Sequence, residues 1–187
     1  KFYEQGYRDF TGVNLSGIDL SGIMLIGVNL TAANLVGANL SRAFLTKSIL
    51  SEATFNWANL SFAKMSEVNL AQADLTKANL TGAFMVKSQL TDAQLSGANL
   101  AHANLRAANL LGANLCGAKL FKVNLRQANL TQTNLKWADL RQGRLTGAQL
   151  QGSSLTGVNL GQTFLIDVDL SSTDLRGINF SQARLTK

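Results

Sequence analysis

An apolar residue recurs at every fifth position from Phe10 to Leu185, with no insertion or deletion in the register. Of these 36 central positions, 31 are Leu, three are Phe and two are Met. The residue two places earlier is Ala in 19 cases, and the residue between the two is Asn or Asp in 22. In an α-helix, successive central residues would point roughly 140° apart, because each residue turns the chain by about 100°. The repeat therefore excludes an amphipathic helix and requires a periodic extended structure.

In an extended backbone, alternate residues share a face, so the Ala and the Leu point inward together and the Asn or Asp points outward. The chain must also turn once in every five residues. Thirteen of the 16 glycines lie two places after the central residue, which is the third position of such a turn. A type II turn needs a positive φ there, and glycine adopts it at no steric cost. Where Lys, Glu, Gln or Trp occupies that place, we expect a type I turn instead. Extended rungs joined by regular turns predict an all-β parallel β-solenoid.

The number of sides in each coil follows from the outward positions that are neither Asn nor Asp. Fourteen positions depart from the rule, and seven of them fall on one series with a spacing of twenty residues. A period of twenty predicts four five-residue sides per coil, and hence nine coils. At about 4.8 Å per rung the rod would be roughly 43 Å long. The seven departures are Met24, Phe44, Lys64, Phe84, Arg144, Phe164 and Arg184.

Residues 98–102 (Ala-Asn-Leu-Ala-His) and 108–112 (Ala-Asn-Leu-Leu-Gly) resemble the A(D/N)LXX unit of the pentapeptide-repeat family. The resemblance covers about residues 9–187 and implies a right-handed quadrilateral parallel β-helix. Residues 1–8 break the pattern, so we interpret them as a lead-in or cap in which Phe2, Tyr3 and Tyr7 lie over the first coil. The repeat runs to Leu185 with no comparable closing segment, and we expect the domain, residues 9–187, to be part of a larger protein.

The composition offers little chemistry. One cysteine excludes an intramolecular disulfide framework, and one cysteine with one histidine argues against a structural zinc site. Both residues, His102 and Cys116, fall at outward turn positions on different sides of the coil, with no carboxylate predicted to orient the histidine. We therefore expect no enzyme activity, no catalytic or metal site and no cofactor.

The charge is distributed unevenly. Residues 1–92 carry seven basic and seven acidic residues, and residues 167–187 carry three of each. Residues 93–166 carry seven basic residues and one acidic residue, so the whole net charge of +6 lies there. The same edge of the rod is apolar in the first half, and exposed apolar residues beside arginines are typical of binding surfaces. The predicted interaction edge consists of Met24, Phe44, Phe62, Phe84, Arg106, Lys119, Phe121, Lys122, Arg126, Arg141 and Arg144.

The first functional hypothesis is a non-catalytic scaffold or protein-interaction domain whose protein partner is unidentified. The resemblance extends to repeat domains of membrane-associated cyanobacterial proteins involved in heterocyst glycolipid localisation, which implies a cytoplasmic or membrane-associated location within a larger protein. The alternative is a soluble binder of anionic surfaces, such as acidic lipid, through the basic band. A DNA mimic that inhibits gyrase would need a strongly negative rod, and this one is positive. We expect no sequence-specific nucleic-acid binding, because Phe121 is the one aromatic residue among the basic residues that could stack on a base. The sequence does not define the oligomeric state.

Overall fold

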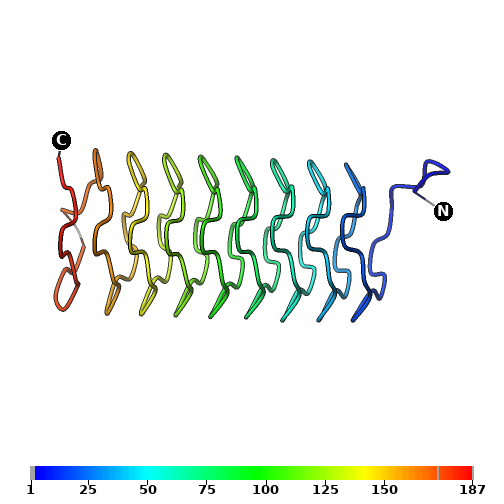
Figure 1. Ribbon diagram of the computed structural model, residues 1–187, viewed down its shortest axis with the longest axis horizontal. Helices are drawn as coiled ribbons and strands as arrows, with labels where there is room; N and C mark the ends of the chain where they lie inside the picture. Colours follow the sequence, from blue (N-terminus) through cyan, green and yellow to red (C-terminus); the bar gives the residue numbers. More distant parts are fainter. Residues whose placement is uncertain (1–2, 172, 187) are drawn as a thin grey trace.

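The computed structural model describes residues 3–171 and 173–186 and shows a straight rod of stacked coils (Figure 1). Within these residues there is no helix and no multi-residue strand, and the regular contacts are single-residue parallel bridges. Each bridge joins an outward middle residue to the one twenty positions later, from Asp9↔Asn29 to Phe164↔Arg184. The chain is therefore a β-solenoid that advances by one rung in every twenty residues, as the outward departures predict.

The interior is filled by the two inward positions of each repeat. From Leu25 to Leu165 the central residues are almost completely shielded from solvent, and so are most of the Ala and Val residues two places before them. Four polar residues share this interior: Ser48, Ser88, Thr133 and Thr163. Each of their hydroxyls donates to a main-chain carbonyl, so the described core holds no buried polar side-chain atom without a partner. The inward assignment of Ala and Leu is confirmed.

In a repeat with an outward Asn or Asp every backbone N–H has a defined acceptor, which explains the preference for these residues. In residues 33–37, the N–H of Asn34 donates to the preceding coil, and those of Leu35 and Gly37 donate to the following coil. The N–H of Ala33 closes the turn on the preceding central leucine. The remaining N–H, of Val36, donates to Asn34 Oδ1 at 3.1 Å. A carboxylate or amide two residues earlier thus satisfies the one donor that the stack cannot.

The turns differ from the expectation in one respect. Every described residue at the third turn position has a positive φ, and this includes Lys47, Glu52 and Trp57, at 61°, 60° and 57°. The prediction of type I turns at non-glycine positions is therefore wrong. The physical reason is that the N–H of this residue donates to a carbonyl of the next coil, as Lys47 does to Ser66 O at 3.1 Å. A type I turn would rotate that peptide away from the coil axis and lose the bond.

The two ends of the rod are less completely covered. Tyr3 packs against the first coil, its ring lies 3.9 Å from the Arg8 guanidinium, and its main-chain carbonyl accepts a hydrogen bond from the same group. Tyr7 is 60% exposed, so the expectation that it lies over the core is wrong, and Phe2 lies outside the described residues. At the other end, Leu175 and Leu185 are 40% and 52% exposed.

Burial of the central residues leads to a first prediction. Leu105 is fully buried, and a carboxylate there would have no partner, so Leu105→Asp should prevent cooperative folding. The matched control is Asn104→Asp, which places the same charge one residue away on the outside and keeps an oxygen for the N–H of Arg106. Circular dichroism and thermal melting of the two variants test this. A soluble, cooperatively melting Leu105→Asp protein would contradict the inward assignment.

The turn geometry leads to a second prediction. A Cβ on Gly97 would meet only Lys77 Cγ, at 3.7 Å, so Gly97→Ala should cost about 1 kcal/mol of unfolding free energy through its φ of +65° alone. Ala107 has a φ of 56°, and Ala107→Gly should change stability in the opposite direction by up to about 1 kcal/mol. Urea denaturation measures both. Equal changes of the same sign would argue against a conformational cause.

The outward aspartates predict how stability depends on pH. Hydrogen bonds from the side chain and backbone of Arg176 lower the pKa of Asp174 from 3.8 to about 2, and the pKa values of Asp9, Asp19, Asp74 and Asp139 are also lowered. A carboxyl whose pKa is lower in the folded state stabilises the fold above its unfolded pKa, and this contribution is lost as the pH falls through the folded value. The melting temperature should therefore fall between about pH 4 and pH 2. In Asp139→Asn/Asp174→Asn the fall should be smaller, since Asn keeps the backbone bond but does not titrate.

Candidate functional site

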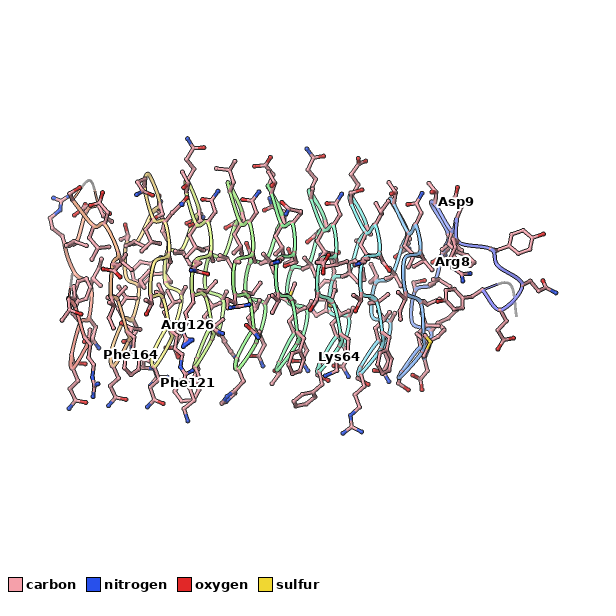
Figure 2. The ribbon with its side chains drawn as sticks, turned by 90° about the horizontal axis from the view of Figure 1, so that it is seen from above. Arg8, Asp9, Lys64, Phe121, Arg126 and Phe164 are labelled. Atoms are coloured by element: carbon pink, nitrogen blue, oxygen red, sulfur yellow. The ribbon has the colours of Figure 1, made fainter. Side chains whose placement is uncertain are left out.

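One outward column runs along the rod through both halves of the predicted edge. We call it the central column, and parallel bridges link each member to the next. Two columns of turn residues flank it. In Figure 2, Lys64 lies toward the N-terminal end of the rod, and Phe121, Arg126 and Phe164 lie toward its C-terminal end. The central column consists of Met24, Phe44, Lys64, Phe84, Asn104, Asn124, Arg144, Phe164 and Arg184.

The first half of the edge exposes apolar side chains. Met24 is 56% exposed and Phe62, in a flanking turn, is 50% exposed. Phe44 and Phe84 are 39% and 41% exposed. The Nζ atom of Lys64 lies 3.7 Å from the centre of the Phe84 ring, so this lysine covers part of the aromatic surface through a cation–π contact. This half is an apolar strip in which Lys64 is the cation of the central column, and Arg42 lies near Phe62 in the flanking turn column.

The second half is hollowed. A groove of about 640 Å³ lies between the central column and the adjacent turn column, and the predicted residues Lys122 and Arg144 line it. A smaller hollow of about 310 Å³ on the other side of Arg144 is also lined by Arg126. Arg106 lies one coil before Arg126 in the same turn column, outside both hollows. The structure therefore brings Lys122, Arg126 and Arg144 together at concave surface.

Phe121 is at the centre of a cluster of cations. The ring lies 5.2 Å from Lys122 Nζ and 5.9 Å from the Arg141 guanidinium carbon. His102 contacts the same ring edge to face, at 5.7 Å between centroids. Because these groups cover the aromatic surface, Phe121 orders the cations around it rather than presenting a free ring.

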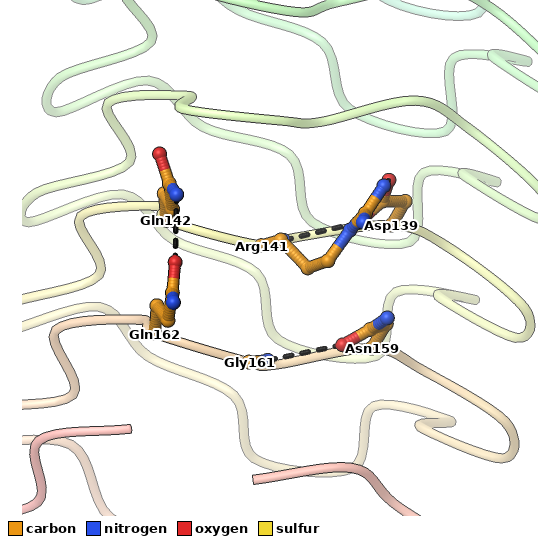
Figure 3. Close-up of polar contacts among 6 residues, drawn as sticks. All are labelled: Asp139, Arg141, Gln142, Asn159, Gly161 and Gln162. Atoms are coloured by element: carbon orange, nitrogen blue, oxygen red, sulfur yellow. Dashed lines mark hydrogen bonds and ion pairs between the residues drawn. The ribbon is translucent and has the colours of Figure 1, made fainter. Parts of the chain in front are cut away.

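Not all of the basic band is free to attract an anion. Arg141 forms a two-pronged ion pair with Asp139, with N–O distances of 2.8 and 2.7 Å (Figure 3). The side-chain hydrogen bonds from Arg141 lower the pKa of the Asp139 carboxyl and raise that of the guanidinium. Lys119 belongs to the same column as Asp139 and is bridged to it through the backbone. The band thus divides into a strip in which Asp139 neutralises Arg141 and a strip around Arg144 that holds no acidic residue.

Several residues of the hollowed surface are absent from the predicted edge. In the larger groove they are the turn residues His102, Gln142, Gln162 and Gln182, together with Asn124 and the last two members of the central column, Phe164 and Arg184. The sequence contains a signal for these last two, because both belong to the series of departures with a spacing of twenty. The glutamines also recur at that spacing. The predicted edge ended at Arg144 because it followed the excess of basic residues along the chain.

The remaining chemistry of the described chain is sparse. The backbone N–H of Cys116 donates to Asn114 Oδ1, and His102 contacts the Phe121 ring. Among residues 3–171 and 173–186, no group of three or more His, Cys, Asp or Glu residues is placed to hold a metal ion. The described residues contain no helix long and apolar enough to cross a bilayer. Trp57 and Trp137 are 63% and 67% exposed on another side, where Lys77 Nζ lies 5.6 Å from the Trp57 ring.

Known structures share this architecture. HetL, a pentapeptide repeat protein involved in heterocyst differentiation regulation from the cyanobacterium Nostoc sp. strain PCC 7120, is 30% identical, with a TM-score of 0.54 over 97% of this chain and 88% of HetL. A pentapeptide repeat protein from the Arabidopsis thaliana thylakoid lumen is 30% identical over 52% of this chain and 68% of its own, with a TM-score of 0.51. Full-length QnrB1, a plasmid-mediated fluoroquinolone resistance protein, covers 96% of this chain and 94% of its own with a TM-score of 0.61. Its identity is 17%, so the likeness concerns the fold alone.

A comparison with curated protein sequences gives no match. The family model for pentapeptide repeats, in contrast, matches overlapping segments at 9–42, 29–61, 53–92, 88–127, 108–147, 118–157 and 148–186. These segments contain the central leucines, the inward alanines and the bridging outward residues described above. The resemblance inferred from the five-residue repeat is confirmed over nearly the whole length, and the chain belongs to the pentapeptide-repeat family.

Proposed function

We propose that this protein is a non-catalytic scaffold that binds a protein partner along the edge formed by the central column and its flanking turns. The observation that carries the proposal is the continuity of this edge, on which exposed Phe and Met side chains are followed by hollows lined with Lys and Arg. Apolar and aromatic anchors beside arginines are the composition of protein–protein interfaces.

The rigidity of the rod supports this proposal. The N–H groups of Leu105, Ala107 and Asn124, for example, all bond between coils, at 2.8 to 3.0 Å. A surface held in this way loses little conformational entropy when a partner binds, which favours affinity without large movements. The repeat register of twenty residues supports nine four-sided coils, and the family resemblance supports a right-handed sense, so that the edge would follow one side of a straight rod.

The biological setting is part of the proposal. HetL takes part in heterocyst differentiation regulation, and this chain is 30% identical to it. Together with the similarity to repeat domains of heterocyst glycolipid localisation proteins, this favours a role in a heterocyst-forming cyanobacterium, within a larger, membrane-associated protein.

The cations of the second half favour one alternative, attachment to an anionic lipid surface. In that case binding to anionic liposomes would be salt-dependent and would be lost on Arg126→Glu/Arg144→Glu.

Affinity capture tests the proposed edge. The triple variant Phe44→Ala/Phe84→Ala/Arg126→Gln removes two exposed rings and one cation, and it should reduce recovery of the partner at least tenfold relative to the wild type. The matched control is Ile49→Ala/Trp57→Ala/Lys136→Gln, which removes two exposed apolar groups and one cation from other sides and should retain the partner. Quantitative mass spectrometry of the captured proteins provides the measurement. Identical partner lists for the wild type and the edge variant would refute the proposal.

A further inference from the structure

The groove in the second half of the edge has a defined lining. It lies between residues Asn124 to Arg184 of the central column and the neighbouring turn column, and its volume is about 640 Å³. Its walls are built from separate coils, so residues twenty positions apart lie one above another along it. The residues that line it are His102, Lys122, Asn124, Gln142, Arg144, Gln162, Phe164, Gln182 and Arg184.

The lining of the groove carries positive charge. Three of its lining residues are cations, and none of those described is acidic. The carboxylate of Asp139, in the column on the other side of the turn, is occupied by Arg141 and so does not compete for them. Guanidinium groups such as those of Arg144 and Arg184 bind carboxylates through two parallel hydrogen bonds. The two arginines are exposed, and neither forms an ion pair with another of the described residues.

One wall of the groove is a ladder of amides. Gln142 Nε2 donates to Gln162 Oε1 at 2.6 Å, and Gln162 Nε2 donates to Gln182 Oε1 at 2.7 Å (Figure 3 shows the first of these bonds). The two bonds link the three side chains into a row along the rod axis. Such a wall offers polar groups at a regular spacing, which suits contacts with the peptide groups of an extended chain.

The aromatic residue of the groove indicates which kind of anion fits. Phe164 lies in the central column between Arg144 and Arg184, and the Arg184 guanidinium carbon is 5.2 Å from the centre of its ring. The ring is therefore partly covered and offers a poor surface for stacking a nucleotide base. It remains an apolar floor between two cations, against which a small apolar side chain can pack.

The spacing of the two arginines matches an extended peptide. They are two rungs apart, which at about 4.8 Å per rung is roughly 9.6 Å. A polyproline II chain rises about 3.1 Å per residue and repeats every three residues, so side chains at i and i+3 lie about 9.3 Å apart on one face. Carboxylates at every third residue would therefore meet Arg144 and Arg184 in turn, with the peptide backbone between them passing over Phe164.

We propose that this groove binds an extended acidic peptide segment of the partner protein, with Asp or Glu at every third position paired to Arg144 and Arg184 and the backbone against the glutamine ladder. The inference rests on the proposed scaffold function and names the chemistry of the partner at one part of the edge. Lys122 and His102 extend the site toward the first half of the rod.

Fluorescence anisotropy with synthetic peptides tests this inference. The probe is a fluorescein-labelled peptide of four Glu-Pro-Ala units, and the control peptide has the same composition with its four glutamates adjacent. At low salt the wild-type protein should bind the spaced peptide at least fivefold more tightly than the clustered one. Arg144→Gln/Arg184→Gln should weaken that binding at least tenfold, and Lys77→Gln/Lys136→Gln, which removes two exposed cations from another side, should change it less than twofold. Thermal melting of each variant verifies that it is folded.

Three results would overturn the inference. They are equal affinity for the two peptides, equal loss in the groove and control variants, and tighter binding of a twelve-residue oligothymidine or of vesicles containing anionic lipid than of the spaced peptide. If the peptide fails to bind while the Phe44/Phe84/Arg126 variant still loses the captured partner, the groove assignment is wrong and the scaffold function stands. If both experiments fail, the scaffold function is wrong as well.

Discussion

The hydrogen bond that the third residue of a turn donates to the next coil is the constraint on which most of this structure depends. It accompanies a positive φ whether the residue is glycine, lysine or tryptophan, as at Gly37, Lys47 and Trp57. A non-glycine residue in this conformation costs about 1–2 kcal/mol. The cost is tolerated because each turn is one unit of a stack in which the backbone donors already have partners on adjacent coils. Turn positions can therefore carry many different side chains while the backbone conformation stays the same.

This invariance produces the functional surface. Because the backbone repeats every twenty residues, side chains that are far apart in sequence form straight columns, and the chemistry of a column is the chemistry of its successive members. The central column changes from Met and Phe to Arg along the rod, while the column through Asn59 and Asn79 carries hydrogen-bonded amides, for example at 3.2 Å between these two residues. The same scaffold thus places a column whose chemistry changes along the rod beside a column of mostly amides, which Lys119 and Asp139 interrupt.

Much of this could be predicted from the sequence, because the repeat has no breaks. The inward Leu and Ala, the twenty-residue register and the candidate edge all follow from period and composition. The turn conformation could not be predicted from the sequence. Local propensity disfavours a positive φ at residues other than glycine, but a hydrogen bond to a residue nineteen positions away, as from Lys47 to Ser66, stabilises it. The division of the basic band could not be predicted either. It depends on whether an arginine bonds to an aspartate of its own repeat, as Arg141 does with Asp139, or projects into a groove, as Arg144 does.

The twenty-residue register has a consequence for how such proteins change in evolution. Inserting or deleting a single pentapeptide would leave every inward position and every turn intact, so the fold would tolerate it. Such a change would, however, rotate all of the chain beyond it by one side, and the column that carries Met24 and Phe44 would continue into different residues. Four pentapeptides together would lengthen the rod and keep its edges aligned. The number of pentapeptides between two surface residues thus decides whether they lie on the same side of the rod, without affecting whether the protein folds.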